Sequence, residues 1–198
     1  MVDESVANFL FEAGMLKNLP RSGWKTIRAP DESVAEHCFR AMMVADLLSL
    51  MAKMNEGERL ALLRAVLYHD LHEARIGDLH KIARKYAESD EKKAERDQRE
   101  KLPAKIQEEI TNALEGLPKK IIDYASDADK LECAITAKEY LDLGYKSQEW
   151  MSSTKAGLRT KEAKELFLQI EKANSLEWVV GHMKGCRKEV DGKKQQES

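Results

Sequence analysis

The sequence predicts an all-α protein that folds as a single helical bundle. Leu, Ala and Met, which favour helices, number 52 residues, whereas the β-branched residues Val and Ile number only 17. The chain has only 4 Pro and 10 Gly among its 198 residues. Apolar residues recur at helical spacing along several segments. An all-β sandwich or barrel is therefore disfavoured, and so is a disordered chain.

The N-terminal half is expected to hold three helices, at about residues 5–17, 33–54 and 58–74. A turn segment at residues 19–25 follows the first helix and carries Trp24. Ser33 fits the N-cap of the second helix, because Glu36 stands three residues later and completes a capping box. The third helix is expected to break at Gly77.

The C-terminal half is expected to hold three further helices. Pro103 and Pro118 fit the first turns of two of them, and the last covers about residues 161–184. Between the halves, 13 of the 18 residues from 84 to 101 are charged, which predicts a solvated helix or a mobile loop.

Domain organisation follows from the length and from the hydrophobic pattern. A chain of 198 residues can bury a core without disulfides, and no linker separates a second hydrophobic system. We therefore expect one domain over residues 1–185. Residues 186–198 are mainly polar, and we expect them to form a disordered tail.

The net charge and the hydropathy of the chain limit the kinds of partner that it can bind. A net charge of -2 provides no positive field for a nucleic acid polymer, and no apolar stretch approaches a membrane span. The acidic N-terminus lacks the basic region of a secretory signal, and the three cysteines are widely spaced. We therefore expect a cytoplasmic protein that binds neither nucleic acid nor membrane.

Four polar residues stand where helical spacing predicts buried apolar ones. His37 lies in the apolar stripe of the second helix, and His69, followed by Asp70, continues the stripe of the third. Asp129 continues the stripe of the helix that follows Pro118. Taken alone, each has an ordinary explanation, such as a core histidine with a hydrogen-bond partner. Four together indicate a shared site, because a buried ionisable group is costly unless it is paired or metal-bound.

The chemistry of this set suits a divalent metal. Two imidazoles and two carboxylates fit Mn, Fe, Co or Zn, or Mg with more water, and leave open positions for water and substrate. A structural zinc site is disfavoured, because no thiolate cluster accompanies these residues. Glu73 shares the side of His69 and Asp70, and Asp78 follows directly after Gly77. His72, His80 and His182 are expected at the surface.

Longer motifs surround the same residues. They are Pro20-Arg21-Ser22-Gly23-Trp24, Glu32-Ser33-Val34-Ala35-Glu36-His37, His69-Asp70-Leu71-His72-Glu73 and Asp127-Ala128-Asp129-Lys130-Leu131-Glu132. On these motifs the chain resembles the HD-domain 5′-deoxynucleotidase family of the HD metal-dependent phosphohydrolases. Within that family it is similar to the group of eukaryotic HD domain-containing protein 2 and its archaeal relatives. The resemblance covers about residues 5–180.

The resemblance implies a helical HD domain, a homodimer and hydrolysis of deoxyribonucleoside 5′-monophosphates to deoxynucleoside and phosphate. It implies a divalent cofactor such as Mn, Co, Mg or another transition metal. His37, His69, Asp70 and Asp129 match the family's metal ligands.

The resemblance also implies roles for residues around the metal. Glu73 and Asp78 match an acidic pair expected to orient the attacking water, to protonate the leaving 5′-oxygen or to hold a second metal. Trp24 matches a tryptophan near the sugar in the bacterial branch, although an apolar plug is an equal alternative. That branch has a phosphate-orienting arginine directly before the tryptophan. Gly23 stands there in this chain, so Arg21 is the candidate for phosphate binding.

Two other kinds of function stay open. The metal set alone also fits a cyclic-nucleotide or guanosine-polyphosphate phosphodiesterase, or a nucleoside triphosphohydrolase. A triphosphate needs more cations near the site, for which Lys81, Arg84 and Lys130 are candidates. A non-catalytic nucleotide-binding module that keeps a structural metal is the other alternative. Glu73 and Asp78 argue against it, because a structural site has no use for them.

Overall fold

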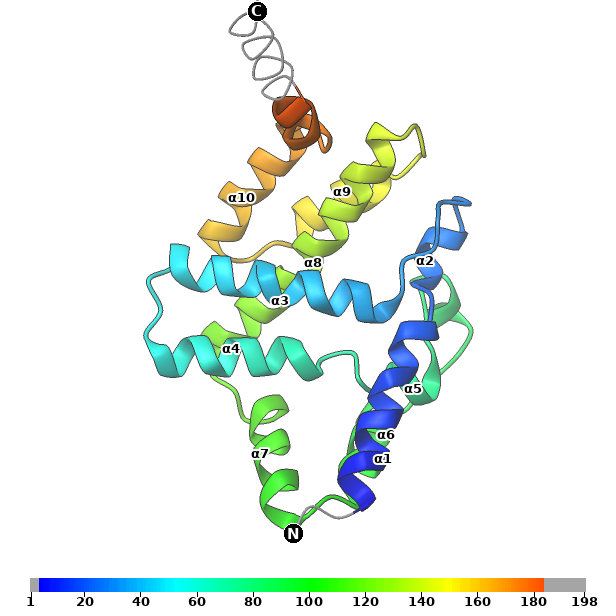
Figure 1. The fold of residues 1–198 in the computed structure, drawn as a ribbon, viewed down its shortest axis with the longest axis vertical. Coiled ribbons are helices and arrows are strands. Elements are labelled where there is room, and N and C mark those ends of the chain that lie inside the picture. Colours follow the sequence, from blue (N-terminus) through cyan, green and yellow to red (C-terminus); the bar gives the residue numbers. More distant parts are fainter. Residues whose placement is uncertain (1–3, 184–198) are drawn as a thin grey trace, which may run out of the picture.

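The computed structural model describes residues 4–183, and the regular elements in that part of the chain are helices (Figure 1). The one exception there is an isolated β-bridge between Pro20 and Ser33. The predicted all-α fold is therefore confirmed, whereas the predicted tail at 186–198 lies outside the described residues. The helices are α1 (Glu4–Ala13), η1 (Gly14–Asn18), α2 (Ser22–Lys25), α3 (Val34–Met51), α4 (Glu56–Tyr68), α5 (Glu73–Ile76), η2 (Ala83–Lys85), α6 (Glu91–Arg99), α7 (Ala104–Leu114), α8 (Lys119–Asp142), α9 (Gln148–Gly157) and α10 (Lys161–Lys172).

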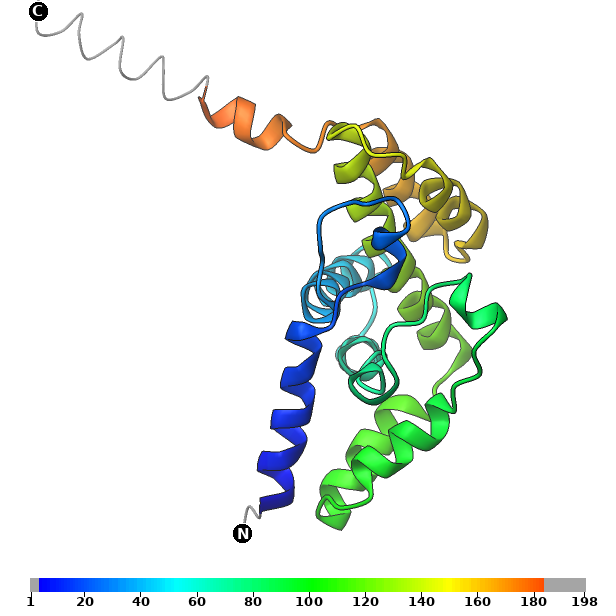
Figure 2. The same ribbon diagram turned by 90° about the vertical axis from the view of Figure 1, so that its right-hand side faces the viewer.

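The core lies where α3, α4 and α8 pack together. Figure 1 shows α3 and α4 side by side with α8 crossing both of them, and α8 also contacts α9 and α10. Ala128, Ala134 and Ala137 on α8 are fully buried, so small side chains allow the helices to approach closely. Seen from the side, α9 and α10 lie at one end of the molecule and α1, α6 and α7 at the other (Figure 2).

The start of α3 is fixed by the predicted capping box. Ser33 accepts a hydrogen bond from the Glu36 backbone N–H, and the Glu36 side chain accepts one from the Ser33 backbone N–H. The loop before α3 is closed by the Arg21 N–H, which donates to the Glu32 carbonyl oxygen at 2.8 Å. Because of this closure, Arg21 and Trp24 are held beside the first turns of α3.

The third predicted helix ends earlier than expected. α4 stops at Tyr68, the chain turns through residues 69–72, and α5 begins at Glu73. Adjacent residues on a continuous helix point about 100° apart, so His69 and Asp70 would diverge. The turn lets both side chains reach the same point. Gly77 has a φ of 78°, which confirms the predicted break.

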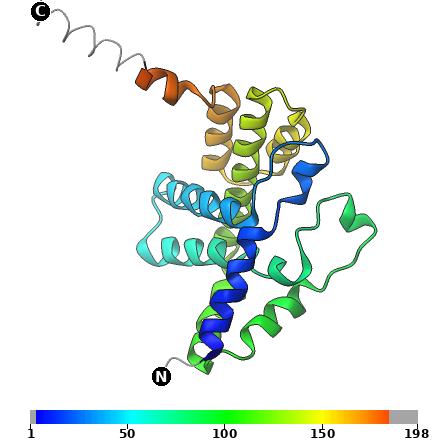
Figure 3. The same ribbon diagram turned by 45° about the vertical axis from the view of Figure 1, so that its right-hand side comes forward.

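Half of the charged segment at residues 84–101 forms the helix α6, which covers Glu91–Arg99 and packs against the rest of the fold. α6 buries Ala94, Gln98 and Arg99, whereas its other face is solvated as expected. The Gln98 side-chain amide donates to the Leu71 carbonyl oxygen at 2.9 Å and to Glu12 at 2.9 Å. α6 therefore braces the turn that carries His69 and Asp70. The segment between α5 and α6 lies on the same side of the molecule as α2 (Figure 3).

The C-terminal half differs from expectation in two places. No helix was predicted over Gln148–Gly157, where α9 forms and buries Met151 and Thr154. The last helix was expected over 161–184, but α10 ends at Lys172 and helix resumes at residues 177–183. The interruption follows from hydrogen bonds of Asn174 and Asp142 side chains to backbone N–H groups. Among the described helices, none combines the length and the apolar composition that crossing a bilayer requires.

Candidate metal centre

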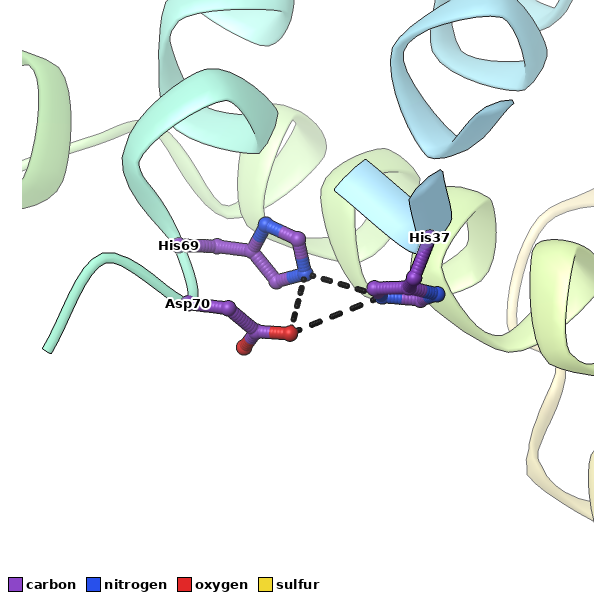
Figure 4. A group of neighbouring side chains, drawn as sticks. All are labelled: His37, His69 and Asp70. Atoms are coloured by element: carbon purple, nitrogen blue, oxygen red, sulfur yellow. Dashed lines mark hydrogen bonds and ion pairs between the residues drawn. The ribbon is translucent and has the colours of Figure 1, made fainter. Parts of the chain in front are cut away.

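Three of the four polar residues singled out in the sequence point toward one another (Figure 4). His37 comes from the first turns of α3, and His69 and Asp70 follow the end of α4. The two Nε2 atoms lie 3.4 Å apart, and Asp70 Oδ2 lies 3.5 Å from His37 Nε2 and 3.2 Å from His69 Nε2. These three donor atoms form a compact group that could hold a metal ion.

Asp129 extends the cluster from α8. Its Oδ1 atom lies 3.3 Å from His37 Nε2 and 4.0 Å from His69 Nε2. Three segments that are far apart in the sequence therefore contribute to one cluster. Helical spacing placed each residue on an inward face, and the packing of α3 against α4 and α8 brings the faces together.

The donor set and its spacing fit a divalent cation. Two ligand atoms that each lie about 2.1 Å from a metal ion, with an angle of about 90° at the metal, are roughly 3 Å from each other. The shorter distances between the donor atoms of this cluster are close to that value. His69 Nδ1 lies 2.7 Å from the Val66 carbonyl oxygen, which can only accept a hydrogen bond. Nδ1 therefore carries the hydrogen, and the lone pair of Nε2 is available to a metal.

Opposite charges hold the cluster in the interior. Burial by itself lowers the pKa of His37, but hydrogen bonds to Asp129 and Glu132 outweigh it and raise that pKa to about 10. Burial by itself raises the pKa of Asp70 and Asp129, yet the neighbouring imidazoles hold both below their usual range. A cation bound here would compete with protons for the imidazole nitrogens, so metal affinity should fall as the pH falls.

Sequence reasoning missed two charged residues behind His37. Glu132 on α8 is fully buried and contacts His37 Nδ1, and Arg40 Nε donates to Glu132 Oε1 at 2.9 Å. A signal was present in the spacing: Arg40 stands three residues after His37, and Glu132 three after Asp129. Glu132 continues the stripe of Asp129, but neither it nor Arg40 received a role from the sequence.

A cavity of about 640 Å³ opens beside the cluster, and Asp70 and Asp129 line it. Its size is typical of small-molecule sites. α9 contributes Trp150, Ser153 and Thr154 to the wall. Sequence reasoning gave none of these three residues a role in the site, because α9 itself was not predicted. The other predicted site residues in the wall are Arg21, Trp24, Glu73 and Asp78.

Arg21 reaches from its loop into the cluster. Its Nη1 atom lies 3.3 Å from Asp70 Oδ2. Burial by itself lowers the pKa of the Arg21 guanidinium, but the carboxylates of Asp70, Asp129 and Asp78 raise it well above its usual range. A permanent positive charge therefore faces the cavity next to two metal-ligand candidates.

Trp24 is a core residue that also lines the cavity. It is only 2% exposed, and its ring packs 5.2 Å from both Tyr140 and Trp150, measured between ring centroids. Its indole N–H donates to Glu32 Oε2 at 2.7 Å. Because that donor is used, Trp24 can offer a ligand only the apolar surface of its ring.

Glu73 and Asp78 lie in the cavity wall in different environments. Glu73 is buried, and its Oε2 atom has no hydrogen-bond partner among the described residues. Burial, together with the charges of Asp70 and Asp78, raises the pKa of Glu73 to about 9. Asp78 accepts a hydrogen bond from the Ser22 backbone N–H and so ties the Arg21 loop to the segment after α5.

Two of the three remaining histidines differ from expectation. His72 is buried against α6, where its Nδ1 atom lies 3.7 Å from Glu95 Oε1. His80 is half-buried in the cavity wall, because its backbone N–H donates to the Ser22 hydroxyl at 3.1 Å. Only His182 is exposed as predicted.

Comparison with known proteins agrees with this geometry. The family model described as HD domain matches residues 13–171. The chain is 26% identical to human 5′-deoxynucleotidase HDDC2 over 86% of this chain and 87% of that protein. A conserved hypothetical protein of Pyrococcus furiosus superposes with a TM-score of 0.67 at 27% identity, over 84% of this chain and 99% of that one. The HD phosphohydrolase DatZ of cyanophage S-2L, solved with dA and one catalytic Zn²⁺, shares the fold at 17% identity, with a TM-score of 0.56 over 82% and 94% of the two chains. The chain therefore belongs to the HD domain family.

Proposed function

We propose that this protein is a metal-dependent phosphohydrolase that converts deoxyribonucleoside 5′-monophosphates to deoxynucleoside and phosphate. The observation that carries the proposal is the placement of Arg21 in one cavity with Asp70 and Asp129, two of the proposed metal ligands. A cation site next to a fixed guanidinium suits a phosphate group. The name of the human relative, 5′-deoxynucleotidase, supports the same substrate class.

The proposed metal ligands are His37, His69, Asp70 and Asp129. A bound divalent cation would supply Lewis acidity toward a phosphoryl oxygen and lower the pKa of water. Mn, Co and Mg, or another transition metal, all suit two imidazoles with two carboxylates. The Zn²⁺ in the cyanophage HD phosphohydrolase supports a divalent ion in this fold.

Glu73 is proposed as the proton donor to the leaving 5′-oxygen. It lines the cavity, and its raised pKa keeps it protonated at neutral pH, as a general acid requires. Asp78 is proposed to orient the attacking water with the oxygen that Ser22 leaves free. A second metal between Glu73 and Asp78 is the alternative role for this pair.

Arg21 is proposed to bind the substrate phosphate, and Trp24 to form the apolar wall beside the sugar. An apolar ring at that position would disfavour a 2′-hydroxyl, because a buried hydroxyl without a partner is costly. The position of both residues in the cavity wall supports these roles.

A nucleoside triphosphohydrolase is the second candidate, because Lys81, Arg84 and Lys130 all line the cavity. Each of them already has a protein partner. Lys81 Nζ donates to the Ser153 hydroxyl, Arg84 Nη1 lies 3.0 Å from Glu91 Oε1, and Lys130 Nζ donates to Ser126. These contacts favour a monophosphate, since a triphosphate would have to break them.

We also propose a homodimer that forms through the outer face of α3. Phe39, Met43, Leu47 and Leu50 share that face, and each is more than half exposed. The opposite face of α3 is buried in the core, so the helix is apolar on both sides. A helix of this kind is normally covered on both faces. A cytoplasmic location is proposed because Cys38 and Cys133 are free thiols.

Metal binding should stabilise the fold. Adding Mn²⁺ to chelator-treated protein at about 100 times its Kd should raise the free energy of unfolding by about 2.7 kcal/mol, measured by urea denaturation. His37→Ala should abolish the increase, and His182→Ala, at an exposed site, should retain it. An equal increase in the His37 variant would contradict the proposed ligand set.

Phosphate release should require both metal and a deoxyribonucleoside 5′-monophosphate. We expect release from these substrates with Mn²⁺, Co²⁺ or Mg²⁺, and much less from ribonucleotides, 3′-monophosphates and cyclic nucleotides. Asp129→Ala should reduce turnover at least 1000-fold, because it removes a ligand from the cluster, while the circular dichroism spectrum stays helical. Faster release from triphosphates would favour the second candidate, and no release from metal-loaded protein would favour a binding module.

Arg21→Ala should weaken substrate binding. Loss of a charge-assisted contact to phosphate should raise KM by roughly 10- to 100-fold, as measured by steady-state kinetics with saturating Mn²⁺. Lys25→Ala is the matched control, because Lys25 is a cation in the same loop that pairs with Asp31 at the surface. An unchanged KM in the Arg21 variant would remove it from the substrate site.

Charges on the outer face of α3 should dissociate the dimer. Wild-type protein should sediment as a dimer at micromolar concentration, and the double variant Phe39→Glu, Leu47→Glu as a folded monomer, because both new carboxylates would be buried in the interface. Leu168→Glu, at a 42% exposed position on α10, is the control and should stay dimeric. A monomeric wild-type protein would exclude this interface.

A further inference from the structure

The His37 ring is held on both of its nitrogens. Nε2 faces the metal-ligand cluster, whereas Nδ1 contacts the Oε2 atom of Glu132. Glu132 is fully buried, and its other oxygen accepts hydrogen bonds from Arg40 Nε at 2.9 Å and from the Thr136 hydroxyl at 3.0 Å. Both carboxylate oxygens of Glu132 are therefore occupied, and the side chain has one defined position.

Arg40 is itself fixed from several directions. Its Nη1 atom donates to both carboxylate oxygens of Glu139, at 2.8 and 2.9 Å. Its Nη2 atom lies 3.4 Å from Glu32 Oε1, and Glu32 in turn accepts the Trp24 indole N–H. The guanidinium thus spans three carboxylates and connects the support of His37 with the support of the cavity wall.

Stability alone does not account for this arrangement. A buried ion pair gains little or nothing over well-packed apolar residues, because both charges lose their hydration. The Glu132 carboxylate is taken out of water entirely, and it contacts a residue of the proposed metal centre rather than a distant surface. A role toward His37 would explain why this carboxylate is buried at the metal centre.

We infer that Glu132, fixed by Arg40, is a positioning residue that holds His37 with Nδ1 protonated and Nε2 directed at the metal. This inference rests on the proposed metal site. A carboxylate that accepts the Nδ1 hydrogen fixes the tautomer and the ring orientation, and it increases the donor strength of Nε2. Such partners typically change metal affinity by about 10- to 100-fold.

The first test is the affinity of chelator-treated protein for Mn²⁺ alone, measured by isothermal titration calorimetry. Glu132→Gln should raise the Kd by about 10- to 100-fold. The substitution keeps the shape of the side chain, and Arg40 keeps its bidentate pair with Glu139, so the variant should fold. At saturating Mn²⁺ its KM for nucleotide should stay within about twofold of wild type, because Glu132 is not among the residues that line the cavity.

Glu139→Gln is the matched control. It removes one carboxylate from the same arginine and from the same helix, but Glu139 is 42% exposed on its side chain and has no contact with His37. Its Kd for Mn²⁺ should stay within about twofold of wild type, since the support of His37 is unchanged. A loss equal to that of Glu132→Gln would overturn the inference, because the effect would then be one of net charge.

Arg40→Gln separates positioning from simple attraction between charges. Removing a positive charge near a cation site should tighten Mn²⁺ binding if only Coulomb forces act. If Arg40 instead fixes Glu132, the same substitution should weaken binding. Weaker binding by folded protein supports the inference, and tighter binding overturns it. This variant also provides the answer if Glu132→Gln fails to fold.

Failure of the inference is distinguishable from failure of the proposed function. Wild-type protein that binds no Mn²⁺, or His37→Ala protein that binds it normally, would overturn the metal site itself. Normal Mn²⁺ affinity in Glu132→Gln, together with loss of binding in His37→Ala, would overturn the positioning role alone.

Discussion

Two imidazoles and two carboxylates converge in a helical core, and the rest of the structure is arranged around that convergence. Each of these groups would be costly to bury alone, because charge is poorly solvated in a protein interior. Together they offset one another: the carboxylates raise the pKa of His37 and His69, and the imidazoles lower the pKa of Asp70. A cation bound between these groups would be held by the same carboxylates and would compete with protons for the imidazoles.

The helices that carry the ligands are also the helices that make the core. α8 supplies Asp129 toward the cluster and packs its alanines against α3 and α4. The position of the ligands is therefore as well defined as the packing of the core itself, which suits a site whose chemistry depends on distances of a few tenths of an ångström. The less regular parts, the turn at residues 69–72 and the loop before α3, are braced by α6 and by the hydrogen bonds of Arg21 and Asp78.

The cavity side and the core side of the cluster serve different purposes. On the cavity side lie the Arg21 guanidinium and Glu73, whose pKa is raised by burial and whose Oε2 atom has no hydrogen-bond partner among the described residues. On the core side, Glu132, Arg40 and Thr136 form hydrogen bonds with one another behind His37. The cavity side is thus open to a substrate, whereas the core side is fixed by hydrogen bonds. This arrangement is expected of a site that must hold its metal ligands in place while the substrate binds and leaves.

The sequence by itself determined the fold class, the capping box at Ser33 and the inward placement of His37, His69, Asp70 and Asp129. Those features depend on composition and on helical periodicity, which are local properties of the chain. Tertiary structure alone decided where α4 ends, that α9 is a helix, and that Glu132 and Arg40 stand behind His37. The break after Tyr68 and the folding of a Ser- and Thr-rich segment depend on contacts with α6 and α8 that are distant in the sequence. Helical periodicity shows which face a residue occupies, but only the packing of helices shows which residue it meets.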